Sequence, residues 1–214
     1  ERLNNSIKNS QENQDKFSNS INTSYSNGNK LLSTIKNIAL AVGGISAIKG
    51  LFNLSDEMTN NKARLNLIVD DGGSVEALQN KIFVSSMNAR ASYQTTTDII
   101  TKLGLQAGKA FKGNDELIAF AEQLNKTFAI SGTEATGIES TMYNLTQALS
   151  TGVLRGQDLN AVFSNAPQIV QNIADYLNVP IGKIRDMAAD GKISAQSVKN
   201  AMLKAADETN AKFN

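Results

Sequence analysis

The chain has 214 residues, of which 41% are apolar and 19% are charged, so it can form one large or two small domains with a sizeable core. Its 21 basic and 20 acidic side chains leave a net charge of +1, which excludes a strongly basic nucleic-acid platform and an acidic disordered tail. It contains no His and no Cys, which excludes disulfides, zinc sites with Cys or His ligands, and catalysis by a His or Cys side chain.

Residues 1–54 are predicted to form an elongated helical lead-in. Fourteen of the first 30 residues are Asn or Ser, a composition typical of disorder. Apolar residues nevertheless recur at alternating steps of four and three, so that nine of 13 seam positions between Leu3 and Ile45 are apolar. This spacing indicates a weak coiled coil; the alternative is a frayed helix that becomes ordered only against a partner. The most apolar run, Ile38 to Ile48, is shorter than the roughly 20 residues of a bilayer span.

A helix is expected to end over Arg64–Val69, because Asp70-Asp71-Gly72-Gly73 is a strong stop signal. After residue 73 the sequence predicts short helices joined by tight turns. The expected helices run from Ser74 to about Ala91, Thr95 to Ala107, Asn114 to Gly132, Thr133 to Gly152, Gln157 to Ser164, Pro167 to about Leu177, Pro180 to Gly191, and Ser194 to Phe213. Helices joined by links of about two to six residues are typical of a compact all-α domain. We therefore predict an all-α fold in which a compact multi-helix domain over 55–214 follows the lead-in.

Three of these helices carry apolar stripes at helical spacing, over 117–128, 138–149 and 198–213. Such stripes need neighbouring helices to cover them, which favours a compact arrangement. Ser74, Asn114 and Ser194 are expected N-caps, because their side chains can accept from backbone N–H groups of the first turn. Pro167 is expected in a first turn, where its missing N–H is tolerated.

No motif of a phosphate loop, a dinucleotide site or a serine hydrolase is present. Two pairs of carboxylates, Glu122 with Glu139 or Glu134 with Glu139, are the candidates for glycoside hydrolysis without His, but solvated helix faces are the preferred interpretation. Asp70-Asp71-Gly72-Gly73 lacks the spaced ligands of a calcium loop and is interpreted as a turn. We therefore predict no catalytic residue, no cofactor and no metal.

Several segments carry a family resemblance, in order along the chain. Ala148-Leu-Ser-Thr-Gly152-Val-Leu-Arg155-Gly156-Gln-Asp-Leu-Asn160 resembles the signature of the phage tail tape measure proteins, in their N-terminal tape measure domain. Asn165-Ala-Pro167 follows at the expected distance, and Asp190-Gly-Lys-Ile-Ser194 and Asn200-Ala-Met202 continue the register. The resemblance covers about 55–214 and is closest to members from phages and prophages of Gram-positive, low-GC hosts.

The resemblance implies a structural protein and no enzyme. Tape measure proteins are long helical chains inside the tail tube; tube subunits polymerise around them, their length sets tail length, and they leave the tube at infection. The expected location is therefore the interior of the virion tail, and the host cytoplasm during assembly. Expected partners are tail tube and other tail proteins and further copies of the chain through its helices, with host membrane contact at infection and no nucleic acid recognition.

The signature segment is interpreted as a structural joint between helices, with a protein-binding surface as the alternative. Its residues are Gly152, Val153, Leu154, Arg155, Gly156, Asp158, Asn165 and Pro167. Both glycines suit turn positions with positive φ. Val153 and Leu154 are expected to anchor the turn in the core, and the Arg155 guanidinium is expected to pair with Asp158 or to reach carbonyls at a helix end.

Two rival functions stay open at this point. One is a cell-wall hydrolase module carried on a tail protein, which requires a carboxylate in a sugar-sized cleft. The other is a membrane-active module that uses residues 31–54.

Overall fold

The computed structural model describes residues 59–213. The predicted lead-in, its coiled-coil seam and the domain boundary near residue 55 therefore lie outside the described residues, as does the proposed membrane-active segment.

Within the described part the all-α prediction is confirmed. After helical residues 59–65 come α3 (Val75–Asn88), α4 (Tyr93–Ala107), the 3-10 turn η1 (Gly108–Ala110), α5 (Asn114–Ser131), α6 (Ala135–Thr151), β1 (Val153–Leu154), α7 (Gly156–Asn165), α8 (Pro167–Leu177), α9 (Ile181–Ala189), β2 (Ile193–Ser194), α10 (Ala195–Lys204) and α11 (Ala206–Phe213). The two-residue strands pair antiparallel, an element too short for the sequence pattern to predict.

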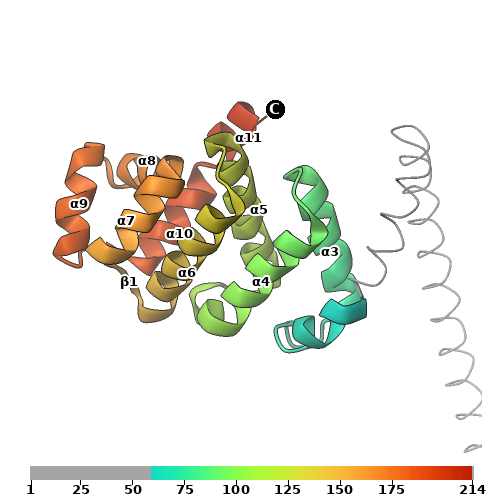
Figure 1. Cartoon of the computed structure of the whole chain (residues 1–214). Helices are drawn as coiled ribbons and strands as arrows, with labels where there is room; N and C mark the ends of the chain where they lie inside the picture. Colours follow the sequence, from blue (N-terminus) through green and yellow to red (C-terminus); the bar gives the residue numbers. More distant parts are fainter. Residues whose placement is uncertain (1–58, 214) are drawn as a thin grey trace, which may run out of the picture. The chain divides into compact units, whose positions relative to one another are not determined.

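The helices follow one another across the molecule, from α3 and α4 at one end to α9 at the other (Figure 1). The chain then returns, so that α10 lies against α5, α6 and α8 in the middle, and α11 lies against α5. The return of α10, which begins at Ala195, brings it into contact with α5, which ends at Ser131.

Many helix boundaries are set by the residues that the sequence singles out. The hydroxyl of Ser74 accepts from the backbone N–H of Ala77, and Ser194 caps α10 in the same way. Gly132 and Gly152 end α5 and α6 with φ of 62° and 90°, a left-handed conformation that glycine adopts without strain.

Three predictions about helix ends were wrong. Asn114 is the first residue of α5 and not its cap, since its side chain bonds to residues of another loop. The helix that begins at Ser74 ends at Asn88 rather than near Ala91, because the chain turns at Arg90, where φ is 52°. The single helix expected from Ser194 to Phe213 is divided at Ala205 into α10 and α11.

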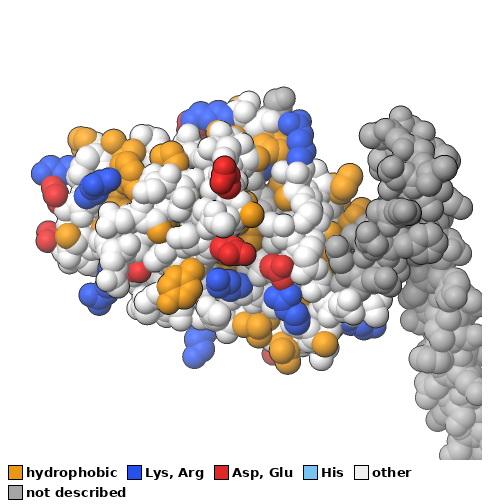
Figure 2. Space-filling model, in the orientation of Figure 1, with side chains coloured by type: hydrophobic (Ala, Val, Ile, Leu, Met, Phe, Trp, Pro, Cys, Tyr) orange, Lys and Arg blue, Asp and Glu red, His pale blue; other side chains and the backbone are white. Residues whose placement is uncertain are grey.

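The predicted apolar stripes supply much of the core. Buried members of the stripes are Leu117, Phe120, Ala121, Leu124, Phe128, Met142, Leu145, Leu149, Val198 and Met202. On the face shown in Figure 2, Lys and Arg side chains are interspersed with Asp and Glu side chains instead of forming a field of one sign. This mixed charge on the visible face agrees with the small net charge of the sequence.

Candidate functional site at the helix joint

The predicted joint, Gly152 to Gly156, lies where α6 turns into α7. The N–H of Gly152 donates to the carbonyl of Ala148 at 2.9 Å and closes the end of α6. Val153 and Leu154 then form β1, which pairs with β2 so that Val153 opposes Ser194 and Leu154 opposes Ile193. Two segments of the sequence signature, some 40 residues apart, therefore form one element.

The strand pair is held by buried apolar side chains on its inner side and by a backbone hydrogen bond at its end. Leu154 and Ile193 are both 0% exposed. The N–H of Ala195, the first residue of α10, donates to the carbonyl of Gly152 at 2.8 Å. The end of α6 and the start of α10 are thus joined directly through the joint. Leu154 lies in the core as predicted, whereas Val153 is only half-buried.

Gly156 does not have the conformation that its sequence context suggested. Among the described residues the glycines with positive φ include Gly152 and Gly191 but not Gly156, which is the first residue of α7. A β-carbon at Gly156 would lie 3.6 Å from the Cα of Ala189, at the end of α9. That is an ordinary contact distance, so Gly156 accommodates the close approach of α9 and is not required by backbone strain.

Arg155 and Asp158 interact in a different way from the expected ion pair. The carboxylate of Asp158 accepts from the backbone N–H of Arg155 at 3.3 Å, which completes the first turn of α7. Asp158 is buried, whereas Arg155 is exposed. No ion pair joins the two among the described residues, so the guanidinium of Arg155 lies at the surface of the joint.

Asn165 and Pro167 lie at the far end of α7, away from the strand pair. The side-chain amide of Asn165 donates to the backbone carbonyl of Ala161. The backbone carbonyl of Asn165 accepts from the Thr133 hydroxyl at 2.6 Å. A β-carbon at Gly137 would lie 3.0 Å from the Asn165 Oδ1, so α6 and α7 approach closely here. Pro167 opens α8 as predicted. The structure therefore places the eight signature residues at both ends of α7 rather than at one point.

Two reciprocal hydrogen bonds between Asp70 and Asn114, which the sequence pattern did not predict, hold the start of α5. The N–H of Asn114 donates to the Asp70 carboxylate, and the Asn114 side-chain oxygen accepts from the N–H of Asp70, each at 2.8 Å. The Asn114 amide also donates to the carbonyl of Ile68 at 2.8 Å. Asp70 therefore supplies the anion at the start of α5, and Asp70-Asp71-Gly72-Gly73 is a turn with a capping role.

Another missed contact is an ion pair that joins α10 to α5. The Lys199 ammonium lies 2.9 Å from the Glu116 carboxylate, with side-chain exposures of 3% and 20%. Burial raises the pKa of Glu116, but the hydrogen bonds from Lys199 and from the backbone N–H of Lys112 outweigh it and leave this pKa below its ordinary value. The charges thus favour the position of α10 against α5, which also positions the joint.

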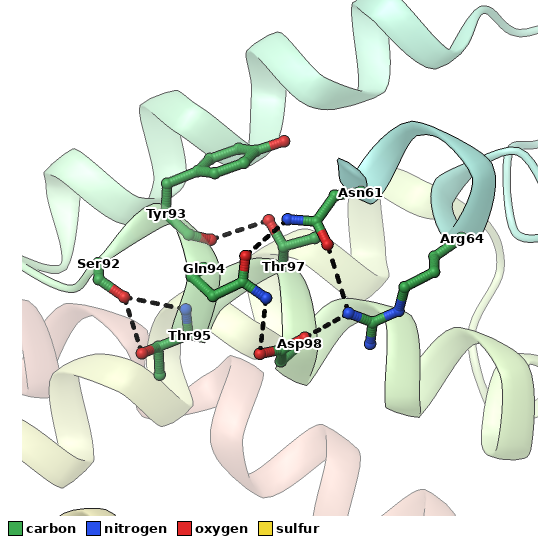
Figure 3. Close-up of polar contacts among 8 residues, drawn as sticks. All are labelled: Asn61, Arg64, Ser92, Tyr93, Gln94, Thr95, Thr97 and Asp98. Carbon is green, nitrogen blue, oxygen red and sulfur yellow. Dashed lines mark hydrogen bonds and ion pairs between the residues drawn. The ribbon is translucent and has the colours of Figure 1, made fainter. Parts of the chain in front are cut away.

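Polar side chains also attach the first described helix to α4 (Figure 3). The Asn61 amide donates to Gln94 at 2.8 Å, and Arg64 pairs with Asp98. Gln94 donates to the other oxygen of Asp98 at 3.0 Å. Both oxygens of the Asp98 carboxylate therefore have a partner, Arg64 on one and Gln94 on the other.

The carboxylates considered for hydrolysis do not converge. Glu139 lies with Asp98 in a hollow of about 250 Å³ between α4 and α6. Glu122 lines a different hollow, between α3 and α5, and pairs with Lys126 at 2.8 Å. Neither hollow contains Glu134. The described geometry therefore gives no support to a paired-carboxylate site at these residues.

Residues 59–213 contain neither a cluster of metal-binding side chains nor a helix that could span a membrane. No group of three or more acidic side chains in residues 59–213 is arranged to hold a metal ion. None of the helices described there has the length and apolar character needed to cross a bilayer.

The comparisons with known proteins agree with the resemblance. No curated protein and no solved structure gives a significant match. The family model described as "Tape measure protein" matches residues 49–214, a range that contains the whole joint, both strands and every described helix. Because this match spans more than half of the sequence, the chain belongs to the tape measure protein family, whose members are structural components of phage tails.

Proposed function

We propose that residues 55–214 act as a folded module of a tail-length ruler, around which tube assembly begins. Family membership makes the chain a structural protein of the phage tail that associates with other tail proteins. Placement inside the tube, assembly in the host cytoplasm, release at genome ejection and contact with the host membrane belong to the proposal.

The observation that carries the proposal is the backward course of the chain. A straight helix of residues 59–213 would be about 230 Å long, at about 1.5 Å per residue. Instead α10 returns to contact α5, α6 and α8, and a domain of this size has a radius of gyration of about 15 Å. The module therefore adds far less length than its residue number implies, which fits a role in assembly better than a role as a segment of the ruler.

Electron microscopy of tails from the encoding phage tests this division of roles. Leu154→Asp places a charge at a fully buried joint position without changing the chain length, and Leu105→Asp is its control, at a position that is 52% exposed. We expect Leu154→Asp to reduce the number of tails while the remaining tails keep normal length. Leu105→Asp should leave both unchanged.

Deletion supplies the opposing outcome. Removal of residues 74–214 should abolish tails or scatter their lengths, whereas removal of predicted extended helix elsewhere in the parent chain should shorten them in proportion. Tails made at normal yield, but shortened in proportion to the residues lost from 74–214, would contradict the proposal.

A further inference from the structure

The junction between α10 and α11 bends without a residue that breaks helices. Lys204 ends α10 and Ala206 begins α11, with one residue, Ala205, between them. Alanine is the best helix former, and the apolar spacing of 198–213 fits one continuous helix. What favours the break locally is charge, since Asp207 is acidic in the first turn of α11 and Lys204 is basic in the last turn of α10. The bend is therefore weakly encoded by its own residues.

The bent position of α11 depends on a small surface that we call the α11 seat, formed by Arg90 and by α5 around Lys126. The buried Lys126 ammonium donates to the Asn210 side chain at 2.8 Å. The Arg90 guanidinium lies 4.7 Å from the centre of the Phe213 ring, and Lys126 lies 5.7 Å from it. The seat thus recognises an amide and an aromatic ring, one turn apart on a helix.

Little apolar surface secures α11 in the seat. Thr209 is the one α11 residue that is buried among those described, at 2% exposure. Its other contacts include a 3.4 Å bond from Arg90 to the Phe213 carbonyl, the side-chain contacts of Asn210 and Phe213, and a 3.3 Å bond from Lys212 to Gln168. Detachment of α11 consequently exposes one buried side chain of α11 and removes the Asn210 partner of Lys126, which keeps its ion pair with Glu122.

We propose that the α11 seat accepts α11 from a second copy of this chain, by exchange of the helix between two copies. In the exchanged state residues 195–213 form one straight helix, about 28 Å long. In that state α11 no longer occupies its own seat, which is left open. The second copy supplies the Asn210 and Phe213 that the seat recognises, so the contacts are those of the single chain and only the connection at Ala205 differs.

Two full-length variants with complementary defects test the exchange. Arg90→Ala/Lys126→Ala damages the seat and keeps α11, whereas Thr209→Arg damages α11 and keeps the seat, because an unpaired guanidinium cannot take the place of the buried Thr209 side chain. Native mass spectrometry of the variants, mixed and separate, measures two-copy complexes. We expect at least tenfold more complex in the mixture than in either variant alone. Association through residues 1–58 is common to all samples and cancels in this comparison.

Substitutions at the bend give a second, independent measurement. Asp207→Lys removes a charge that favours a helix start and should raise the exchanged fraction of the otherwise unchanged chain about two- to fivefold. Ala206→Pro is tolerated in the first turn of α11 but cannot lie inside a continuous helix, so it should abolish the exchange. A mixture with no more complex than its components, or complexes that persist undiminished with Ala206→Pro, would overturn the proposal.

Discussion

From β1 to β2 the elements meet through fully buried aliphatic side chains, whereas residues 59–65 meet α3 and α4 partly through polar side chains. In the first region Leu154, Ile173 and Ile193 are 0% exposed. In the second, Leu65 and Ile82 are also 0% exposed, but ion pairs and amide contacts join the elements as well. Several large apolar side chains stay exposed there, namely Leu67, Val84, Met87 and Leu105. Buried apolar contacts resist local opening and solvated polar contacts do not, so the joint region should be the more stable part of the module.

The largest expected effect is at the centre of the joint. Leu154→Ala removes a fully buried side chain and should lower the free energy of unfolding by about 4 kcal/mol, since the cavity cannot be filled without moving β1. Leu105→Ala, at the more polar end, should change it by less than about 0.5 kcal/mol. Urea denaturation of both variants measures the contrast, and similar losses at the two positions would remove the distinction between the regions.

Buried and exposed ion pairs provide the next test. Glu116→Gln leaves the Lys199 ammonium buried without its carboxylate and should cost about 3 kcal/mol. Glu76→Gln breaks the pair of Lys62 with Glu76, whose side chains are 57% and 60% exposed, and should cost less than about 1 kcal/mol. Equal costs would show that burial of the pair between α10 and α5 has no energetic consequence.

The same pair predicts a dependence on pH. Because the pKa of Glu116 is lower in the folded chain than its ordinary value of 4.5, its stabilisation is present above pH 4.5 and is lost as the pH falls through the folded value. The stability difference between the wild type and Glu116→Gln should therefore shrink as the pH is lowered below 4.5. Denaturation curves at a series of pH values measure this difference, and a constant difference would contradict it.

The capping contact between loops should have a smaller effect. Asp70→Ala removes the acceptor for the N–H of Asn114 and should cost about 1–2 kcal/mol. The exposed neighbour Asp71 has the same charge, so Asp71→Ala controls for general electrostatics and should be close to neutral. The contrast is measured by thermal unfolding, and an equal loss for Asp71→Ala would show that net charge, not the cap, matters.

The smallest predicted effect separates the two glycines of the joint. Gly152→Ala introduces a β-carbon where φ is 90° and should cost about 1 kcal/mol. Gly156→Ala places a β-carbon at ordinary contact distance from Ala189 and should be nearly neutral. Comparable losses for the two substitutions would show that close packing against α9 is as demanding as the left-handed turn.

Sequence reasoning succeeded where a helix end depends on neighbouring residues. Ser74 and Pro167 act through their own first turns, and Gly132 and Gly152 through their own φ angles, so their roles are readable from the sequence. It failed at Asn114, because the competing acceptor, Asp70, lies 44 residues earlier.

The candidate site divides in the same way. The burial of Leu154 follows from its apolar character, but the pairing of β1 with β2 depends on the return of α10, which no local pattern specifies. Gly156 was misjudged because it is the first residue of α7, without a positive φ, and does not belong to the turn before that helix. The division at Ala205 was missed because the attractive contacts of α11 lie on α5 and near Arg90.

The register of the two short strands has a mechanical consequence. The chain enters the ladder at Val153 and leaves it at Ser194, and these two residues face each other at the same end. Tension applied along the chain from both sides therefore loads the hydrogen bonds one pair at a time, as in opening a zipper, rather than shearing them together. Until the ladder opens, tension along the backbone passes across β1 and β2 and bypasses residues 155–192, which contain α7, α8 and α9.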